Sequence, residues 1–259
     1  MLKRLIGVIT VKDGWAVQSI SYNKYLPLGR PEILAENLDR WHLEEILIVD
    51  ISSGILRKPN IELINSIASM SLSTPIAYAG GIQTAKHAID VIKAGADRVG
   101  IESLFRDNIL EAGNITDSLG RQAIIRIQPF RVVDRNLQLY NYHDKSTQNS
   151  KGLNSFLETR NLYSELMIVD YENEGIKNGF NSGLLKYFRN SGIQLICFGG
   201  ISSSQQIRTL SKIKNISALA IGNFLNFKEL ANREIGIKRN IRKLRQVSYG
   251  KKTLGEKDW

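Results

Sequence analysis

The sequence predicts one α/β domain, a (β/α)8 TIM barrel, and three observations lead to this fold class. Short apolar runs alternate with helical stretches along almost the whole chain. Each run is continuously apolar, which is typical of parallel strands that are covered on both faces. Three landmarks of the first half return in the second half at a nearly constant spacing. A length of 259 residues is normal for one such barrel.

Eight strands are expected, each a short run rich in β-branched residues. In chain order they are LIGVIT (5–10), ILIVDI (46–51), PIAYAG (75–80), RVGIES (98–103), AIIRIQ (123–128), LMIVDY (166–171), QLICFG (194–199) and ALAIGN (218–223). Helices are expected between them, for example at 31–42, 84–95 and 203–214. Eight strands with helices between them indicate a closed barrel, whose carboxyl-terminal strand ends form a mouth and whose amino-terminal ends form a floor.

An internal repeat divides the predicted barrel into two similar half-barrels. The repeated landmarks are IVD at 48 and 168, the GGI motifs within 79–82 and 198–201, and the stretches GIESLF at 100 and AIGNFL at 220. The simplest account is a duplication of four βα units. We therefore expect a barrel over 1–230, with half-barrels at about 1–118 and 119–230, followed by a basic C-terminal helix and tail over 231–259.

Composition restricts the environment and the class of partner. The formal net charge is +10, and part of it lies in KRNIRKLRQVSYGKK (238–252). That stretch can be a solvated helix face, or it can attract an acidic protein or an anionic substrate. Nucleic acid is disfavoured, because aromatic residues are not interleaved with the basic ones in the way that a stacking platform would need. The single cysteine, Cys197, lies in an apolar run, so we expect a core residue in a reducing, cytoplasmic compartment. No apolar run is long enough to span a membrane.

Paired glycines at the ends of two strands are candidates for phosphate binding. A Gly-Gly pair lets a ligand approach backbone N–H groups, and the following helix start favours an anion. The alternative is a pair of tight turns without a ligand. The candidate phosphate-binding residues are Gly80, Gly81 and Ser103 in the first half, and Gly199, Gly200, Gly222 and Asn223 in the second.

No metal or cofactor is expected. His42 and His87 lie on expected helices and His143 in a polar loop, so we expect them to be solvated or packed rather than catalytic. No His, Cys and carboxylate spacing matches a metal site.

The sequence resembles the HisF-like cyclase subunits of imidazole glycerol phosphate synthase, from histidine biosynthesis. The stretches that carry the resemblance are KRLIGVITVKDG, GRPEIL, EEILIVDI, AGGIQTAKHAIDVIKAGADRV, SLGRQAII, ENEGIKNGF and FGGI, which together span nearly the whole barrel. The resemblance implies a barrel that binds two phosphates. It also implies a HisH-like glutaminase docked on the floor, and ammonia that passes through the barrel to a lyase/cyclase site at the mouth.

The resemblance places the family's two acid–base aspartates, at the mouth ends of the first and fifth strands, on Thr10 and Gln128, with a one-residue gap allowed at the second. Neither side chain exchanges protons near neutral pH as a carboxylate does. The family's substrate-side lysine falls on Gln18. The cyclase chemistry is therefore expected to be lost.

Three carboxylates are candidate substitutes for the missing pair: Asp13, Asp50 and Glu174. Asp50 matches a retained aspartate, and Glu174 stands where the family has an aspartate beside the second phosphate. Glu102 replaces an amide near the first phosphate, and its charge would repel that phosphate.

The floor matches the family better than the mouth does. The resemblance maps the charged ring that closes the family's ammonia passage onto Arg4, Glu45, Arg98 and Glu165, with all four signs retained. Asp97 matches an aspartate that faces the glutaminase. The ring is either an ammonia gate or ordinary salt bridging at the stable face of a barrel.

Three functions follow as hypotheses. The first is a non-cyclising barrel that receives ammonia from a glutaminase and passes it on, as in the glycosyl amidation-associated branch that the stretch GWAVQSISYNKYLPLGRPE resembles. There a sugar amidotransferase would use the ammonia on a surface-polysaccharide sugar. The second is an authentic cyclase that uses other carboxylates. The third is a scaffold without catalytic activity.

Overall fold

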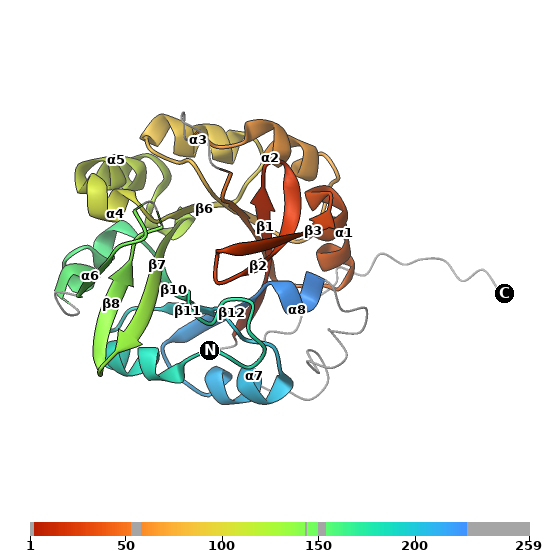
Figure 1. The fold of residues 1–259 in the computed structure, drawn as a ribbon. Helices are drawn as coiled ribbons and strands as arrows, with labels where there is room; N and C mark the ends of the chain where they lie inside the picture. Colours follow the sequence, from red (N-terminus) through yellow and green to blue (C-terminus); the bar gives the residue numbers. More distant parts are fainter. Residues whose placement is uncertain (1–2, 53–57, 143, 150–153, 227–259) are drawn as a thin grey trace.

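A computed structural model describes residues 3–52, 58–142, 144–149 and 154–226, and it confirms the (β/α)8 barrel (Figure 1). Eight parallel strands close on themselves in the order β1-β4-β5-β6-β7-β10-β11-β12, with β12 paired to β1. Their bounds are β1 (Arg4–Lys12), β4 (Glu45–Asp50), β5 (Ile76–Ala79), β6 (Arg98–Ile101), β7 (Ile124–Val133), β10 (Glu165–Asp170), β11 (Leu195–Phe198) and β12 (Ile216–Ile221). Every expected strand is present.

Helices surround the strands on the outside of the barrel (Figure 1). They are α1 (Pro31–Arg40), α2 (Ile61–Ala68), α3 (Ala85–Lys93), α4 (Leu104–Asp107), α5 (Ile109–Leu119), α6 (Asn154–Glu158), α7 (Ser204–Ser211) and α8 (Asn223–Asn226), with 3-10 turns η1 (Arg121–Ala123), η2 (Arg160–Leu162) and η3 (Ser182–Phe188). Side-chain caps fix several starts: Thr84 accepts from the His87 amide and begins α3, and Ser203 accepts from the Gln206 amide and begins α7. A 3-10 turn, rather than an α-helix, connects β10 to β11.

Strand alternation sorts the apolar residues into two layers. On β1, Leu5 and Ile9 pack outward against the helices, whereas Ile6 and Val8 pack inside the barrel. The inner layer also holds several small residues, namely Ala77, Ala79, Ala218 and Ala220. The interior of the barrel, which we call the lumen, is therefore occupied by apolar side chains, and β5 and β12 contribute only methyl groups to it.

Two hairpin excursions at the mouth have no counterpart among the expected elements. The first is β2 (Trp15–Ile20) with β3 (Lys24–Gly29), and it reverses at Ser21 and Tyr22, which both have positive φ. The second runs from β7 into β8 (Asn136–Tyr140) and reverses at Asp134 and Arg135, also with positive φ; β9 (Thr147–Asn149) then pairs with β8. Two consecutive positive-φ residues give the turn type whose twist matches a hairpin.

The repeated glycine pairs occupy matching places. Gly80 and Gly81 follow β5, the third barrel strand, and Gly199 and Gly200 follow β11, the seventh; all four have positive φ. A Cβ on Gly80 would lie 2.6 Å from the Asp50 carbonyl oxygen, and one on Gly199 would lie 2.4 Å from that of Asp170. Backbone packing therefore requires glycine at these places, whether or not a ligand binds. The half-barrel boundaries remain a prediction, and the expected C-terminal helix and tail (231–259) lie outside the described residues.

Candidate functional site

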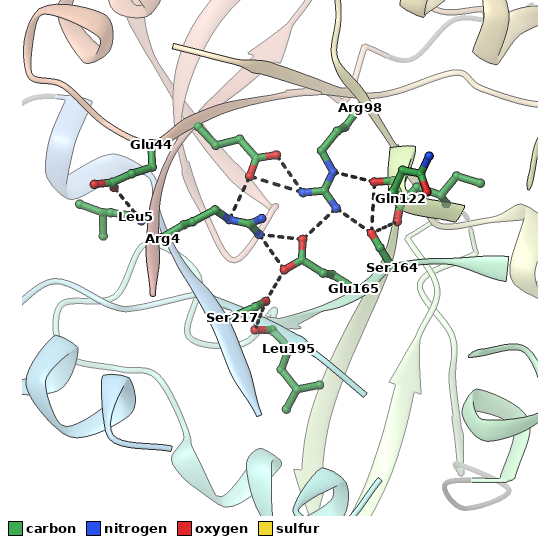
Figure 2. Close-up of polar contacts among 11 residues, drawn as sticks. Arg4, Leu5, Glu44, Arg98, Gln122, Ser164, Glu165, Leu195 and Ser217 are labelled. Carbon is green, nitrogen blue, oxygen red and sulfur yellow. Dashed lines mark hydrogen bonds and ion pairs between the residues drawn. The ribbon is translucent and has the colours of Figure 1, made fainter. Parts of the chain in front are cut away.

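Charged side chains from four strands meet at the floor. Arg4 donates from Nη2 to both carboxylate oxygens of Glu165, each at 2.7 Å. Arg98 lies 2.8 Å from Glu165 through Nη2 and 3.1 Å from Glu45 through Nη1. The Nε of Arg4 lies 3.6 Å from Oε2 of Glu45 and completes the circle. The four residues form a closed ring of alternating charge, which we call the floor ring (Figure 2).

The ring forms because strand alternation turns all four side chains inward. Arg4 stands two residues before the inner Ile6, Glu45 two before Leu47, and Glu165 two before Met167. Arg98 stands two before Gly100, where a Cβ would meet the inner Ala79. The first charged residue of each strand therefore lies at the same level of the barrel, beneath the apolar lumen.

The two carboxylates of the ring differ in their electrostatics. Burial raises the pKa of Glu165, but Arg4 and Arg98 outweigh it and hold that pKa below its usual value. Burial also raises the pKa of Glu45, and there the same arginines offset it only in part. Glu165 receives the bidentate Arg4 contact and a contact from the Ser217 hydroxyl, which explains the difference. Burial lowers the pKa of Arg4, but the carboxylates outweigh it, so the guanidinium stays charged.

Two serines support the ring, and no pattern in the sequence pointed to either of them. Ser217 contacts Glu165, and Ser164 accepts from Nη2 of Arg98 at 2.9 Å (Figure 2). Nε of Arg98 donates to the Gln122 carbonyl at 3.3 Å. Nearby, Asp97 is exposed at the floor and accepts from the Ile76 amide at 2.8 Å. Its exposure leaves it available to a protein that approaches the floor.

At the mouth, the two expected acid–base positions carry no carboxylate and do not face the same way. Thr10 follows the inner Ile6 and Val8 by alternation, so it points into the mouth, where it is 5% exposed. Gln128 stands on the outer face of β7, because the inner residues of that strand are Ile125 and Ile127. The next inward position on β7 is Pro129, which lies one residue further along and agrees with the one-residue gap allowed in matching this strand to the family. The mouth ends of β1 and β7 therefore present a hydroxyl and a proline ring.

Two of the three candidate substitutes point away from the lumen. Asp50 lies on the outer side of β4 and accepts from the Ser52 amide at 2.9 Å and from the Tyr78 hydroxyl at 3.2 Å. Asp13 is exposed and forms an ion pair with Lys12 at 3.0 Å. Neither is placed for proton transfer in the mouth.

Glu174 is the substitute that borders a cavity. The cavity measures about 340 Å³ and is lined by Glu174, Lys177, Phe198, Gly199, Gly200, Gly222 and Asn223, among others. Glu174 is 2% exposed, and burial raises its pKa to about 7, despite hydrogen bonds from the Ser19 hydroxyl at 2.9 Å and the Tyr22 amide at 3.3 Å. The structure thus gathers the second-half glycines, Asn223 and Glu174 around one cavity at the mouth.

The first-half candidates have a different setting. Ser103 precedes α4, and Glu102 forms an ion pair with Arg106 at 3.0 Å, which offsets the repulsion expected from Glu102. A Cβ on Gly81 would meet the Lys58 carbonyl oxygen at 2.5 Å. Gly80, Gly81 and Ser103 thus lie at the mouth ends of β5 and β6, as expected.

A tyrosine cluster joins the two hairpins over the lumen. Tyr22 from the first hairpin packs on Tyr142, with ring centroids 4.8 Å apart, and Tyr142 packs edge-on against Tyr140 at 5.1 Å. Tyr140 stacks on Tyr171, which belongs to the inner core, at 3.9 Å. We call these four residues the mouth cluster. No pattern in the sequence predicted that these four tyrosines lie together.

The first hairpin is also fastened to the second half of the barrel. Asn223 accepts from the Ser19 amide at 3.2 Å, and its amide group donates to the Ser19 carbonyl. Gln18 precedes this point, on β2. Together with the Glu174 contacts, these bonds hold the hairpin across the mouth (Figure 1).

The remaining sequence candidates have structural roles or none. Cys197 is fully buried in the outer core, and burial raises the pKa of its thiol. His87 lies in the first turn of α3, and His42 follows α1 with positive φ. His143 lies outside the described residues.

Comparison with known proteins gives the family. The family model described as histidine biosynthesis protein matches residues 4–231. The chain belongs to this family. A Vibrio vulnificus (strain YJ016) protein with the provisional name imidazole glycerol phosphate synthase subunit hisF2 is 28% identical over 247 residues, which cover 93% of this chain and 89% of that protein. The HisF subunits of Thermotoga sp. (strain RQ2) and Sulfurisphaera tokodaii are 24% and 26% identical, over 91% and 86% of this chain and 93% and 90% of their own length.

The HisF-like resemblance is thereby confirmed for nearly the whole barrel. Within the described residues, no helix has both the length and the apolar character needed to cross a membrane.

Proposed function

We propose that this HisF-like barrel receives ammonia from a HisH-like glutaminase at its floor and passes it through the lumen without cyclising a substrate. The observation that carries the proposal is the contrast between the two ends. The floor ring of Arg4, Glu45, Arg98 and Glu165 is complete, whereas Thr10 and Pro129 occupy the inward mouth positions. Losing a general acid or base costs a rate factor of about 10²–10⁴ for each group.

The floor ring would act as the gate of this passage. Its four side chains touch one another, so a molecule can enter the lumen only if one ion pair opens. The 3.6 Å contact between Arg4 and Glu45 is the longest of the four and is the natural place to open. Above the ring, the apolar lining would admit neutral ammonia more readily than a charged ion.

The acceptor of the ammonia would be a sugar bound by a separate amidotransferase that builds a surface polysaccharide. The resemblance of residues 14–32 to the glycosyl amidation-associated branch supports this choice. A cytoplasmic location follows from the proposal, and cell fractionation would test it.

The second-half cavity would hold the phosphate of a small molecule, with the Gly199–Gly200 and Gly222–Asn223 backbone around it. Its volume lies in the range of about 300–1,000 Å³ that is usual for ligand pockets. A carboxylate at Glu174 would repel a phosphate, but a pKa of about 7 leaves much of this group neutral near pH 7. Gly80, Gly81 and Ser103 would form the corresponding site of the first half.

An authentic cyclase is the second candidate, and Glu174 is the observation that favours it. A buried carboxyl with a pKa of about 7 beside a cavity has the properties of a general acid or base. Supplying ammonia and the family's ribulosyl aminoimidazole substrate to the purified chain separates the candidates.

Reconstitution with a HisH-type glutaminase tests the first proposal. We expect the barrel to stimulate glutamine hydrolysis. The Arg4→Met variant, which opens the floor ring, should impair glutamine-driven amidation, while amidation driven by added ammonium salt persists. A purely structural scaffold would show neither stimulation nor any dependence on Arg4. Equal behaviour of wild type and Arg4→Met in both assays would therefore reject the gate.

A further inference from the structure

A second cavity lies at the floor, beside the floor ring. It measures about 240 Å³ and opens between η1, η2 and the segment that leads into β11. Its lining is polar: Arg121, Arg160, Asn161, Tyr163, Ser164, Ser191, Gly192, Ile193 and Gln194. Two of these residues are cationic, and none is a carboxylate. We call it the floor cavity.

The positive charge around the floor cavity is uncompensated. Arg121 and Arg160 are exposed, and neither forms an ion pair within the part of the chain that the structure describes. The arginines of the floor ring contrast with them, because Arg4 and Arg98 each contact two carboxylates. Two exposed guanidinium groups that form no ion pair are free to bind an anion.

A third arginine lies behind the wall of the cavity. Arg126 is 5% exposed, and its guanidinium carbon lies 4.1 Å from the ring centroid of Phe156 and 5.7 Å from that of Tyr163, which lines the cavity. Its Nη1 donates to the Thr159 hydroxyl at 2.8 Å, whereas its buried Nε has no hydrogen-bond partner in the part of the chain that the structure describes. No carboxylate pairs with it among the described residues. Burial lowers its pKa to about 10, so it still carries a charge near neutral pH and adds to the local potential.

We propose that the floor cavity between Arg121 and Arg160 receives a carboxylate side chain of the protein that docks beneath the barrel. This inference rests on the proposed function, which puts a glutaminase at the floor. Guanidinium groups bind carboxylates through paired hydrogen bonds, and the neutral Asn161, Ser191 and Gln194 supply further polar contacts around the same space.

The position of the cavity connects such a contact to the gate. Ser164 lines the floor cavity, and its hydroxyl oxygen accepts from Arg98 of the floor ring at 2.9 Å. A single side chain therefore separates a bound carboxylate from the ring. Docking at Arg121 and Arg160 would fix the partner's position relative to the point where ammonia enters.

The test compares two variants that lose the same charge. Arg121→Gln/Arg160→Gln removes both cations of the floor cavity. Arg135→Gln/Arg208→Gln is the matched control, because both arginines are exposed, lack an ion pair among the described residues and lie in the β7–β8 turn and on α7. Binding of a purified HisH-type glutaminase is measured by calorimetry at low and high salt. We expect about tenfold weaker binding for the first variant and a smaller salt dependence, with the control close to wild type.

A second experiment tests whether the floor cavity binds carboxylates in the absence of the partner protein. Hexaglutamate peptide is titrated into protein with ¹⁵N-labelled arginine, and the Nε resonances of Arg121 and Arg160 should shift while those of Arg135 and Arg208 do not. Equal glutaminase binding by all three proteins would overturn the cavity's role and leave the proposed function standing. If the glutaminase binds none of the three proteins, the proposed function fails. In that case, shifted resonances with the peptide would still support carboxylate binding by the floor cavity, and unshifted resonances would overturn it.

Discussion

The two ends of the barrel are built from different parts of the chain and have different chemistry. The floor ring takes one residue from each of β1, β4, β6 and β10, so the strands themselves position it. The mouth cluster takes Tyr22 and Tyr140 from hairpins that leave the barrel, and its contacts are aromatic. The floor is charged and closed by ion pairs, while the inward mouth position on β1 holds only a hydroxyl. The comparison teaches that the barrel strands alone position the chemistry of the floor, whereas the mouth takes much of its chemistry from segments that leave the strands.

The largest effect is expected at the floor ring. Replacing Glu165 by Gln leaves Arg4 and Arg98 facing Glu45 alone, and breaking a buried ion pair costs about 3–5 kcal/mol. The free energy of unfolding, measured with urea, should fall by that order. Glu36→Gln, which breaks only the exposed pair with Arg40, should change it by less than about 0.5 kcal/mol. Similar losses for the two variants would show that the ring is not a buried network.

The next effect concerns the pH dependence of the free energy of unfolding, through Glu174, which binds the first hairpin at the mouth. The pKa of Glu174 in the folded protein, about 7, lies above the usual value of about 4.3. The protonated Glu174 side chain therefore contributes its full stabilisation at pH values below about 4.3, and this contribution is lost as the pH rises through about 7. Wild type should therefore lose up to about 3 kcal/mol relative to Glu174→Gln between pH 4.5 and pH 8. Urea unfolding at both pH values measures this difference. A constant difference across the range would mean that Glu174 titrates normally.

A smaller loss is expected from the glycines that shape the second-half cavity. Gly200→Ala forces a side chain into φ +75°, with its Cβ 2.7 Å from the Asn173 carbonyl oxygen, and should cost about 2 kcal/mol or more. Gly222→Ala is the contrast, because its Cβ would meet Phe198 at an ordinary 3.5 Å. It should fold normally but narrow the cavity, and calorimetry with ribose 5-phosphate should show weaker binding. Unchanged binding would remove Gly222 from the phosphate site.

The smallest effect has the opposite sign. Among the described residues, the buried Tyr142 hydroxyl has no hydrogen-bond partner, so Tyr142→Phe should raise the free energy of unfolding by about 1 kcal/mol. Tyr142→Ala should lower it, because the contacts with Tyr22 and Tyr140 are lost. A loss of stability in Tyr142→Phe would show that the hydroxyl has a partner.

The sequence predicted the barrel well and its mouth poorly, for a physical reason. A strand buried on both faces must be apolar throughout, so β1, β4 and β10 could be recognised from short runs alone. The hairpin β2–β3 is only partly buried and contains Pro27, so nothing in its pattern distinguishes it from a loop. The facing of Gln128 depends on register, which a single residue reverses, and only the paired strands determine it.

The same distinction applies to the site. Arg4, Glu45, Arg98 and Glu165 could be assigned through the family resemblance, and the structure shows that each of them starts a strand. Ser164 and Arg121 lie in short connections that precede strands, where sequence spacing carries no information about which way a side chain faces. Their roles became visible only through the contacts around Arg98 and the floor cavity.

The most direct test of the central claim is a comparison of two reactions of the same purified chain with a HisH-type glutaminase. One assay follows glutamine hydrolysis, and the other follows formation of imidazole glycerol phosphate from the ribulosyl aminoimidazole substrate with saturating ammonium. The account predicts stimulated hydrolysis and no imidazole glycerol phosphate above background. Cyclase turnover at the rate of an ordinary enzyme would contradict it and favour the authentic cyclase instead.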